Sequence, residues 1–189
     1  MSKPTFASSA EATAERFLDS LRRYRDDRGA MAALRCAMSP SRRQRAWPCL
    51  GRQAIGDRRY EMVAALYATH PQETAAYGFG ELCRRLSAEH NSFEGRFKRL
   101  LTCDTGEEAA EHVRPLVQAA KAAGKPVNYA GLLADLLEWE RGDGVKVRWA
   151  REFWGAPDEE AISPNLIDAA AATDSADATP AASSGEVKA

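Results

Sequence analysis

Arginine is concentrated in the N-terminal third of the chain, and it is the side chain best suited to binding phosphate groups. Between Arg16 and Arg59 twelve arginines stand against four aspartates, so this stretch carries a net charge of +8 although the whole 189-residue chain carries −1. A guanidinium group binds phosphate oxygens in a bidentate manner and stays charged at any relevant pH. The sequence therefore indicates a polyanionic partner, which the overall pI of about 6.3 conceals.

Several basic residues recur at spacings that place them on one face of a helix. Such faces either stay solvated beside neighbouring acids or contact a polyanion, and the excess of arginine over lysine favours contact. No helix-turn-helix, zinc-finger or RNP signature can be identified, so the sequence predicts phosphate contact without base readout. The groups are Arg28 with Arg35, Arg42 with Arg45, Arg96 with Lys98 and Arg99, and Arg148 with Arg151.

Candidates for catalysis are few. Cys103 stands near His112 and His70 precedes Pro71, but neither pair matches a catalytic motif. No dinucleotide-binding, Walker A or HExxH motif occurs, and four cysteines without a CxxC pair do not give zinc-ligand spacing with only three histidines. We therefore predict no catalytic residue, no metal site and no cofactor, and we expect the cysteines to be buried free thiols.

Apolar residues repeat at intervals of three and four along almost the whole chain, which is the period of an α-helix and not of a strand. The predicted fold is all-α, a compact single-domain bundle of about eight helices with short connections. Residues 42–56 contain two glycines at positions 51 and 56 and a proline at 48, so they are expected to form a short helix or an ordered loop. The expected helices lie near residues 11–26, 29–38, 60–71, 79–86, 92–101, 105–124, 128–139 and 144–153.

Residues with short polar side chains mark the starts of several of these helices. Ser41, Ser92 and Asn128 are expected N-caps, because their side-chain oxygens can accept a hydrogen bond from a free backbone N–H of the first turn. Thr105 followed by Glu108 has the spacing of a capping box.

The last 35 residues differ from the rest in composition. From residue 155 onward seven acids stand against one lysine, and no aromatic residue follows Trp154. This segment has too little apolar surface to offset the entropy of ordering. We predict a helical domain over residues 10–154 and a disordered, acidic, alanine-rich tail over 155–189.

No signal for secretion or membrane insertion can be found. The N-terminus lacks a charged-then-apolar pattern, and no apolar run approaches the roughly 18 residues of a membrane span. We therefore expect a cytoplasmic protein without membrane contact.

Four blocks of sequence follow one another in an order typical of one protein family. They are Arg28-Gly29 with ALR at 33–35, FEGRF at 93–97 with Leu100-Leu101, VNY at 127–129 leading through LLADL at 132–136 to Trp139, and VKVRWAREF at 145–153. The Trp-Ala-Arg-Glu-Phe run in the last block is the most specific of them. Over about residues 15–154 the chain resembles the CasB family, the small subunit of the type I-E CRISPR Cascade complex.

The resemblance implies an all-helical, non-catalytic subunit of an RNA-guided antiviral surveillance complex. The implied partners are CRISPR guide RNA and target DNA, other Cascade subunits, and a second copy of the chain. Base pairing supplies sequence specificity in such complexes, while protein supplies charge and shape for the backbones, including the displaced strand. The residues expected to contact nucleic acid are Arg28, Arg35, Arg42, Arg43, Arg45, Arg96, Lys98, Arg99, Arg148 and Arg151.

Three other functions stay open from the sequence. A helical adapter would use the arginine faces to bind an acidic protein partner. A stand-alone protein for single strands or RNA would need a stacking platform, for which Trp47 is a candidate, although Trp47 also fits a core anchor under a loop. An enzyme would depend on Cys103 or His112.

Overall fold

The computed structural model describes residues 9–88 and 93–155. Within these ranges the chain forms eight α-helices and three short 3-10 helices but no strand, although an isolated β-bridge joins Glu73 to Val127. The predicted all-α class is confirmed. The α-helices are α1 (Ser9–Arg22), α2 (Arg28–Arg35), α3 (Arg58–Thr69), α4 (Phe79–Ser87), α5 (Phe93–Leu101), α6 (Gly106–Ala122), α7 (Tyr129–Glu138) and α8 (Gly144–Trp154), and the 3-10 helices are Cys36–Met38, Arg43–Arg45 and Trp47–Cys49.

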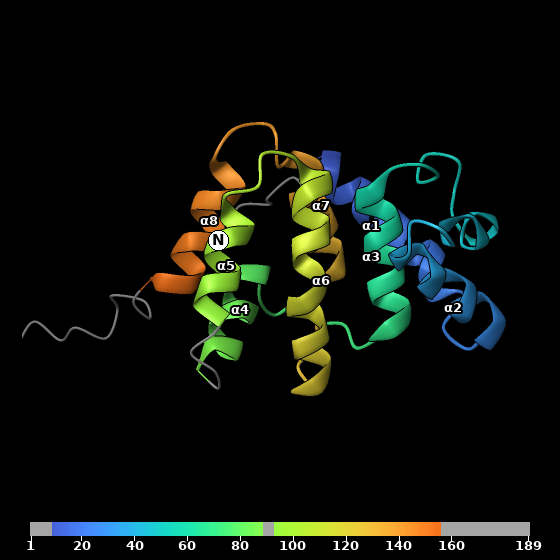
Figure 1. Ribbon diagram of the computed structural model, residues 1–189, viewed down its shortest axis with the longest axis horizontal. Helices are drawn as coiled ribbons and strands as arrows, with labels where there is room; N and C mark the ends of the chain where they lie inside the picture. Colours follow the sequence, from blue (N-terminus) through green and yellow to red (C-terminus); the bar gives the residue numbers. More distant parts are fainter. Residues whose placement is uncertain (1–8, 89–92, 156–189) are drawn as a thin grey trace, which may run out of the picture. The chain divides into compact units, whose positions relative to one another are not determined.

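Helix α6 holds the described helices together. It packs against α3 and α7 and also against α4 and α5. Around it, α1 packs along α7, α2 along α3, and α8 along α4. Figure 1 shows α4, α5 and α8 beside one side of α6, with α1, α2 and α3 beside the other.

The apolar stripe of the last helix, α8, forms a seam in the core. Val145, Trp149 and Phe153 follow one another at intervals of four and are all buried. Phe153 stacks on Phe97 of α5, with ring centroids 4.3 Å apart and planes 12° from parallel. Truncating a buried aromatic residue costs about 3–5 kcal/mol, so this seam is a major source of stability.

Helix α3 is buried on every side from Tyr60 to Ala68. A helix that is apolar all round belongs in the centre of a fold, and α3 is accordingly packed between α2, α6 and α7. The one charged residue in this buried stretch is Glu61, whose carboxylate has no exposed surface. A charge in this position requires hydrogen-bonding partners.

The predicted caps of the two helices on either side of residue 125 are confirmed. The Thr105 hydroxyl accepts a hydrogen bond from the Glu108 amide at 3.2 Å, and the Asn128 side chain accepts one from the Gly131 amide at 2.8 Å. At the start of α6, the Glu108 carboxylate accepts a hydrogen bond from the backbone amide of Asp104, and not from that of Thr105 as in a standard capping box.

The N-cap predicted at Ser41 is wrong. The 3-10 helix there begins at Arg43 without a side-chain cap, and the Ser41 hydroxyl lies 3.1 Å from that of Ser39 instead. A single 3-10 turn leaves fewer free N–H groups than an α-helix, so it has less need of a cap. The N-cap predicted at Ser92 lies outside the described residues.

The first two helices are shorter than expected, because side chains near residue 25 favour a turn. Asp27 accepts a hydrogen bond from the Ala30 amide at 3.0 Å and so starts α2 as its N-cap. Arg22, the last residue of α1, pairs with Glu73 at 2.7 Å, and hydrogen bonding to Glu73 above all raises the pKa of its guanidinium. Helix α2 then tightens into a 3-10 turn at Cys36.

Two further expectations can be compared with the described residues. Cys83 and Cys103 are buried free thiols as predicted, whereas Cys36 and Cys49 are only half-buried. No helix in the described ranges is both long and apolar enough to span a bilayer. The tail predicted from residue 155 lies, apart from Gly155, beyond the described residues.

Candidate nucleic-acid interface

The arginine-rich loop between α2 and α3 is built around the buried carboxylate of Glu61. Its Oε1 accepts hydrogen bonds from the Trp47 indole at 2.9 Å and from the Gly56 amide at 3.1 Å, and its Oε2 accepts one from Arg43 at 3.4 Å. The structure thereby gives Trp47 the role of an anchor for the loop. It also gives Arg43, predicted as a nucleic-acid contact, a partner within the protein.

A hollow of about 460 Å³ lies where the end of α2, the loop and α6 meet. Arg35, Arg42 and Arg114 contribute to its lining, and none of the described residues that line it carries a carboxylate. Three cations around one hollow raise the local positive potential, and a bound anion would relieve their mutual repulsion. The other lining residues are Cys36, Met38, Ser39 and Pro40.

One of these arginines is fixed by the backbone of α3. Arg35 Nε donates a hydrogen bond to the carbonyl oxygen of Ala68 at 2.9 Å. This contact uses one of the five N–H donors of the guanidinium. The remaining donors are therefore held in position at the hollow.

Arg114 was not predicted from the sequence. It stands on α6 with no lysine or arginine within four residues, so no local cluster marks it. Only the packing of α6 against α3 brings it close to Arg35 and Arg42. Arg28, predicted to share a face with Arg35, is exposed at the first turn of α2 and does not line the hollow.

The basic face predicted on α5 is exposed. Arg96 lies over the ring of Phe93, 5.6 Å from its centroid, and Arg99 is on the exposed side of the helix. Lys98 forms an ion pair with Glu94 at 2.7 Å, and hydrogen bonding to Lys98 lowers the pKa of Glu94. Exposed pairs of this kind are weak, so Lys98 can exchange Glu94 for another anion.

The two arginines predicted on α8 differ in their surroundings. Arg148 forms an ion pair with Asp135 of α7, which also accepts a hydrogen bond from the Trp149 indole at 2.6 Å. Burial raises the pKa of Asp135 against the opposing effects of Arg148 and Trp149. Both arginines are exposed, but Arg148 is engaged with Asp135, so Arg151 is the better placed of the two for an external ligand.

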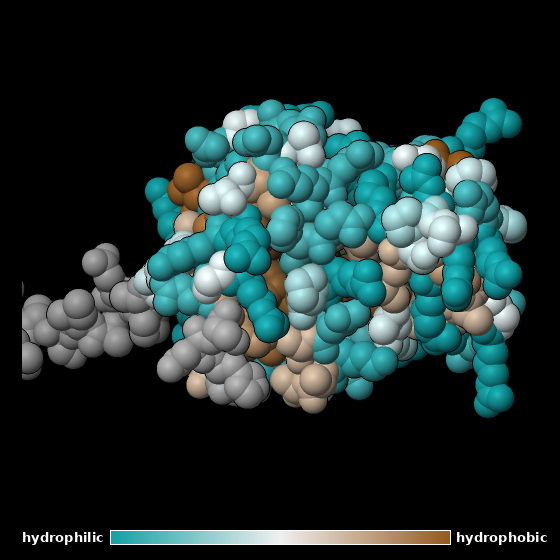
Figure 2. Space-filling view, viewed as in Figure 1, coloured by the Kyte–Doolittle hydropathy of each residue, from teal (hydrophilic) through white to brown (hydrophobic). Residues whose placement is uncertain are grey.

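Most of the surface in view is polar. Figure 2 shows hydrophilic side chains over most of this face, with apolar colour in small separate patches. Among the described large apolar residues, only Ile55, Val147 and Trp154 are exposed. Arg45 adds an exposed cation to the loop after α2. The exposed chemistry of the described helices is therefore mainly that of charged groups.

The thiol considered as a nucleophile has an unfavourable environment for that role. Burial raises the pKa of Cys103 to about 11, and the nearby carboxylate of Glu108 acts in the same direction. A thiol with this pKa is protonated at neutral pH, whereas the thiolate is the reactive form.

The fold and these faces define an all-helical protein with exposed arginine clusters. A family model described as CRISPR-associated protein Cse2 matches residues 20–154. A Cse2 protein of Thermus thermophilus is 34% identical over 173 residues, which cover 82% of this chain and 98% of the relative.

Solved structures agree with this match. A CasB structure from Thermus thermophilus is similar with a TM-score of 0.61 and 30% identity, covering 76% of this chain and 98% of that one. CasB from Thermobifida fusca shares the fold, with a TM-score of 0.59, 21% identity, and coverage of 80% and 100%. The chain belongs to the CRISPR-associated Cse2 family, also called CasB, and is thus a subunit of a CRISPR Cascade complex. The resemblance seen in the sequence is confirmed.

Proposed function

We propose that this protein is the non-catalytic small subunit of a type I-E CRISPR surveillance complex and stabilises the R-loop through contacts with nucleic-acid backbones. Its ligands are the guide RNA, the target DNA and the displaced strand, and its protein partners are other Cascade subunits and a second copy of itself. The observation that carries the proposal is the hollow lined by Arg35, Arg42 and Arg114 without a carboxylate.

The chemistry of this hollow suits a phosphodiester backbone. Guanidinium groups bind phosphate oxygens with charge-assisted hydrogen bonds, and such contacts fix position without reading sequence. The volume of about 460 Å³ lies within the range of about 300–1,000 Å³ common for ligand sites. It leaves room for a sugar beside the phosphate.

A few such contacts are enough to change the outcome of target binding. The RNA–DNA heteroduplex is about as stable as the DNA duplex that it replaces, so R-loop formation is nearly balanced. Contacts that exist only with separated strands therefore shift the equilibrium toward the open complex. Each of them is expected to act on all target sequences alike.

Reversing the charge of two arginines at the hollow tests the proposal. In the Arg42→Glu, Arg114→Glu double variant, the assembled complex should bind target DNA more weakly by at least about 100-fold, because two charge-assisted contacts are each worth about 1.5–3 kcal/mol. The salt dependence should also become shallower. Electrophoretic mobility shifts at several salt concentrations measure both quantities.

The matched control is the Arg23→Glu, Arg25→Glu variant, which makes the same change in net charge with two arginines outside the hollow. It should bind target much more tightly than the hollow variant. Equal losses in both variants would reduce the effect to net charge and contradict a site at the hollow. Circular dichroism should show unchanged helix content in both.

The exposed face of α5 gives a second prediction. The Arg96→Glu, Arg99→Glu variant should weaken target binding by about tenfold or more, since phosphate contacts by exposed side chains are lost and repulsion is added. Helix content should stay the same, because the buried face of α5 is unaffected. Normal binding of target, or a loss of helicity, would remove this face from the interface.

Purification of the tagged protein from its host tests the assembly itself. Repeat-bearing RNA and several further subunits should be recovered with it. Recovery with an acidic protein, free of RNA at moderate salt, would favour the helical adapter instead.

A further inference from the structure

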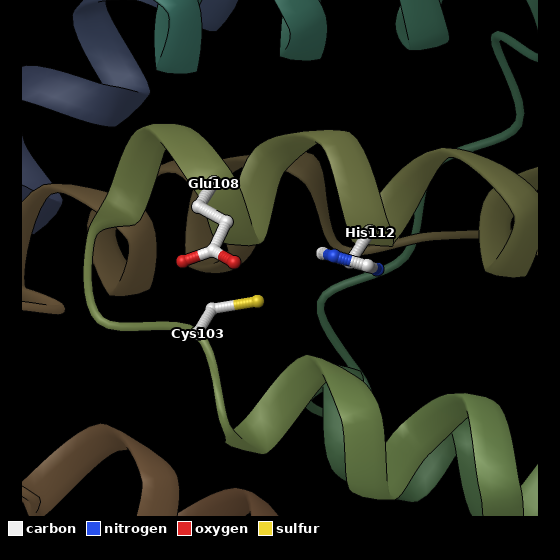
Figure 3. A group of neighbouring side chains, drawn as sticks. All are labelled: Cys103, Glu108 and His112. Carbon is white, nitrogen blue, oxygen red and sulfur yellow. The ribbon is translucent and has the colours of Figure 1, made fainter.

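Three side chains of different chemistry converge at the corner between α5 and α6. Cys103 follows α5, and Glu108 and His112 lie one turn apart on α6. Figure 3 shows the sulfur, the carboxylate and the imidazole gathered around one space between the loop and the helix. One donor atom from each residue lies within 4.8 Å of the other two.

The donor set matches the preferences of Zn²⁺. Zinc is bound by thiolate, imidazole and carboxylate groups at about 2.0–2.3 Å, commonly with four ligands in a tetrahedron. A tetrahedron of that size sets its donor atoms about 3.5 Å apart. Side-chain rotations that move the donor atoms by about 1 Å would bring the three groups to this spacing. Glu108 and His112 have room for such rotations, because Glu108 is exposed and His112 is half-buried.

The surrounding contacts orient two of the donors. The Trp139 indole donates a hydrogen bond to the carbonyl oxygen of Cys103 at 3.0 Å, which fixes the backbone that carries the thiol. Glu108 Oε2 accepts a hydrogen bond from the amide of Asp104 at 3.1 Å, so the other oxygen is available to a metal. Such outer contacts are typical of protein metal sites.

We propose that Cys103, Glu108 and His112 bind one Zn²⁺ ion, with water as the fourth ligand. Binding replaces the thiol proton of Cys103, which passes to solvent, with a sulfur–zinc bond. The ion joins the end of α5 to the first turns of α6 and thereby fixes the angle between these helices. This link between the two helices does not depend on the proposed function.

Cobalt provides a direct probe, because Co²⁺ bound to a thiolate has an intense near-ultraviolet charge-transfer band. The full-length protein, reduced and freed of metal with a chelator that is then removed, should develop this band and saturate at about one equivalent of Co²⁺ per chain. Cys103→Ser should abolish the band. His112→Ala should weaken Co²⁺ binding by at least about 10–100-fold, because loss of a residue that only hydrogen-bonds to a metal ligand already has an effect of that size. Zn²⁺ at about 100 times its Kd should raise the Tm of the wild type by about 5–10 °C.

Cys36→Ser is the matched control, since Cys36 is a half-buried thiol outside the cluster. It should keep both the band and the thermal shift, and circular dichroism should show that all variants are folded. Absence of the band in the wild type would overturn the proposal. So would a band that persists in Cys103→Ser or disappears in Cys36→Ser, because the metal would then be bound elsewhere.

Discussion

Replacing Glu61 with alanine is expected to destabilise the protein by about 3–5 kcal/mol, the usual effect of removing one partner of a buried ion pair. The carboxylate accepts hydrogen bonds from the Trp47 indole, the Gly56 amide and Arg43. Truncation leaves the first two donors without an acceptor beneath the loop and also opens a cavity in α3. For a folded unit of this size we expect the Tm to fall by about 10 °C or more.

Glu61→Gln separates the two contributions of this side chain. The amide oxygen can still accept from Trp47 and Gly56, while the charge that faces Arg43 and Arg58 is lost. The loss of stability, measured by urea denaturation, should be about half that of the alanine variant. If glutamine is as harmful as alanine, the ion pair and not the acceptor oxygen holds the loop.

Replacing Gly80 with alanine should force α4 away from α8 and cost about 3 kcal/mol. A Cβ atom at this position would lie 2.5 Å from the carbonyl oxygen of Trp149 and 2.9 Å from the Cβ of Glu152. A backbone oxygen cannot move aside as the end of a flexible side chain can. The shift would also weaken the hydrogen bond at 3.0 Å from the Gly80 amide to Glu152 Oε2.

Gly95→Ala is the control, since it makes the same change inside a helix where a Cβ meets nothing within 4 Å. Alanine restricts the unfolded chain more than glycine does, so this variant should gain about 0.5–1 kcal/mol. Thermal and urea denaturation of both variants should thus give changes of opposite sign. Two changes of the same sign would show that the close approach of α8 does not determine the effect of a side chain at position 80.

The helices could be predicted because their apolar period is local. Val145, Trp149 and Phe153 mark one buried face by spacing alone, and Asn128 marks a helix start by side-chain chemistry. Boundaries were less predictable where a side chain bonds to a distant partner. Arg22, for example, ends α1 while paired with Glu73, 51 residues further along the chain.

The candidate site could be predicted only in part, because charge density along a chain says little about which cations meet in space. Arg35 and Arg42 were expected from local clusters, whereas Arg114 reaches the same hollow from another helix. Arg43 and Arg148 were expected to face a ligand but pair with Glu61 and Asp135. Each acid lies far from its arginine in the sequence, so spacing rules could not find these pairs.

The family block around Trp149 also has a physical explanation. Trp149 is fully buried, and Glu152 accepts hydrogen bonds from the amides of Gly80 and Glu81 at 3.0 and 3.3 Å. Gly78, at the N-cap of α4, has no side chain to satisfy these donors. A carboxylate from α8 therefore caps α4 from outside.

The pairing of early helices with late ones has a consequence for the order of folding during synthesis. Helix α1 packs along α7, and α4 receives its cap from residue 152, whereas α2 and α3 are neighbours in the chain. Contacts between distant segments require closure of long loops and slow folding. We expect α2 and α3 to associate first on the nascent chain. Helices α1 and α4 then keep apolar faces uncovered until α7 and α8 emerge, and this interval is when the chain is most exposed to aggregation.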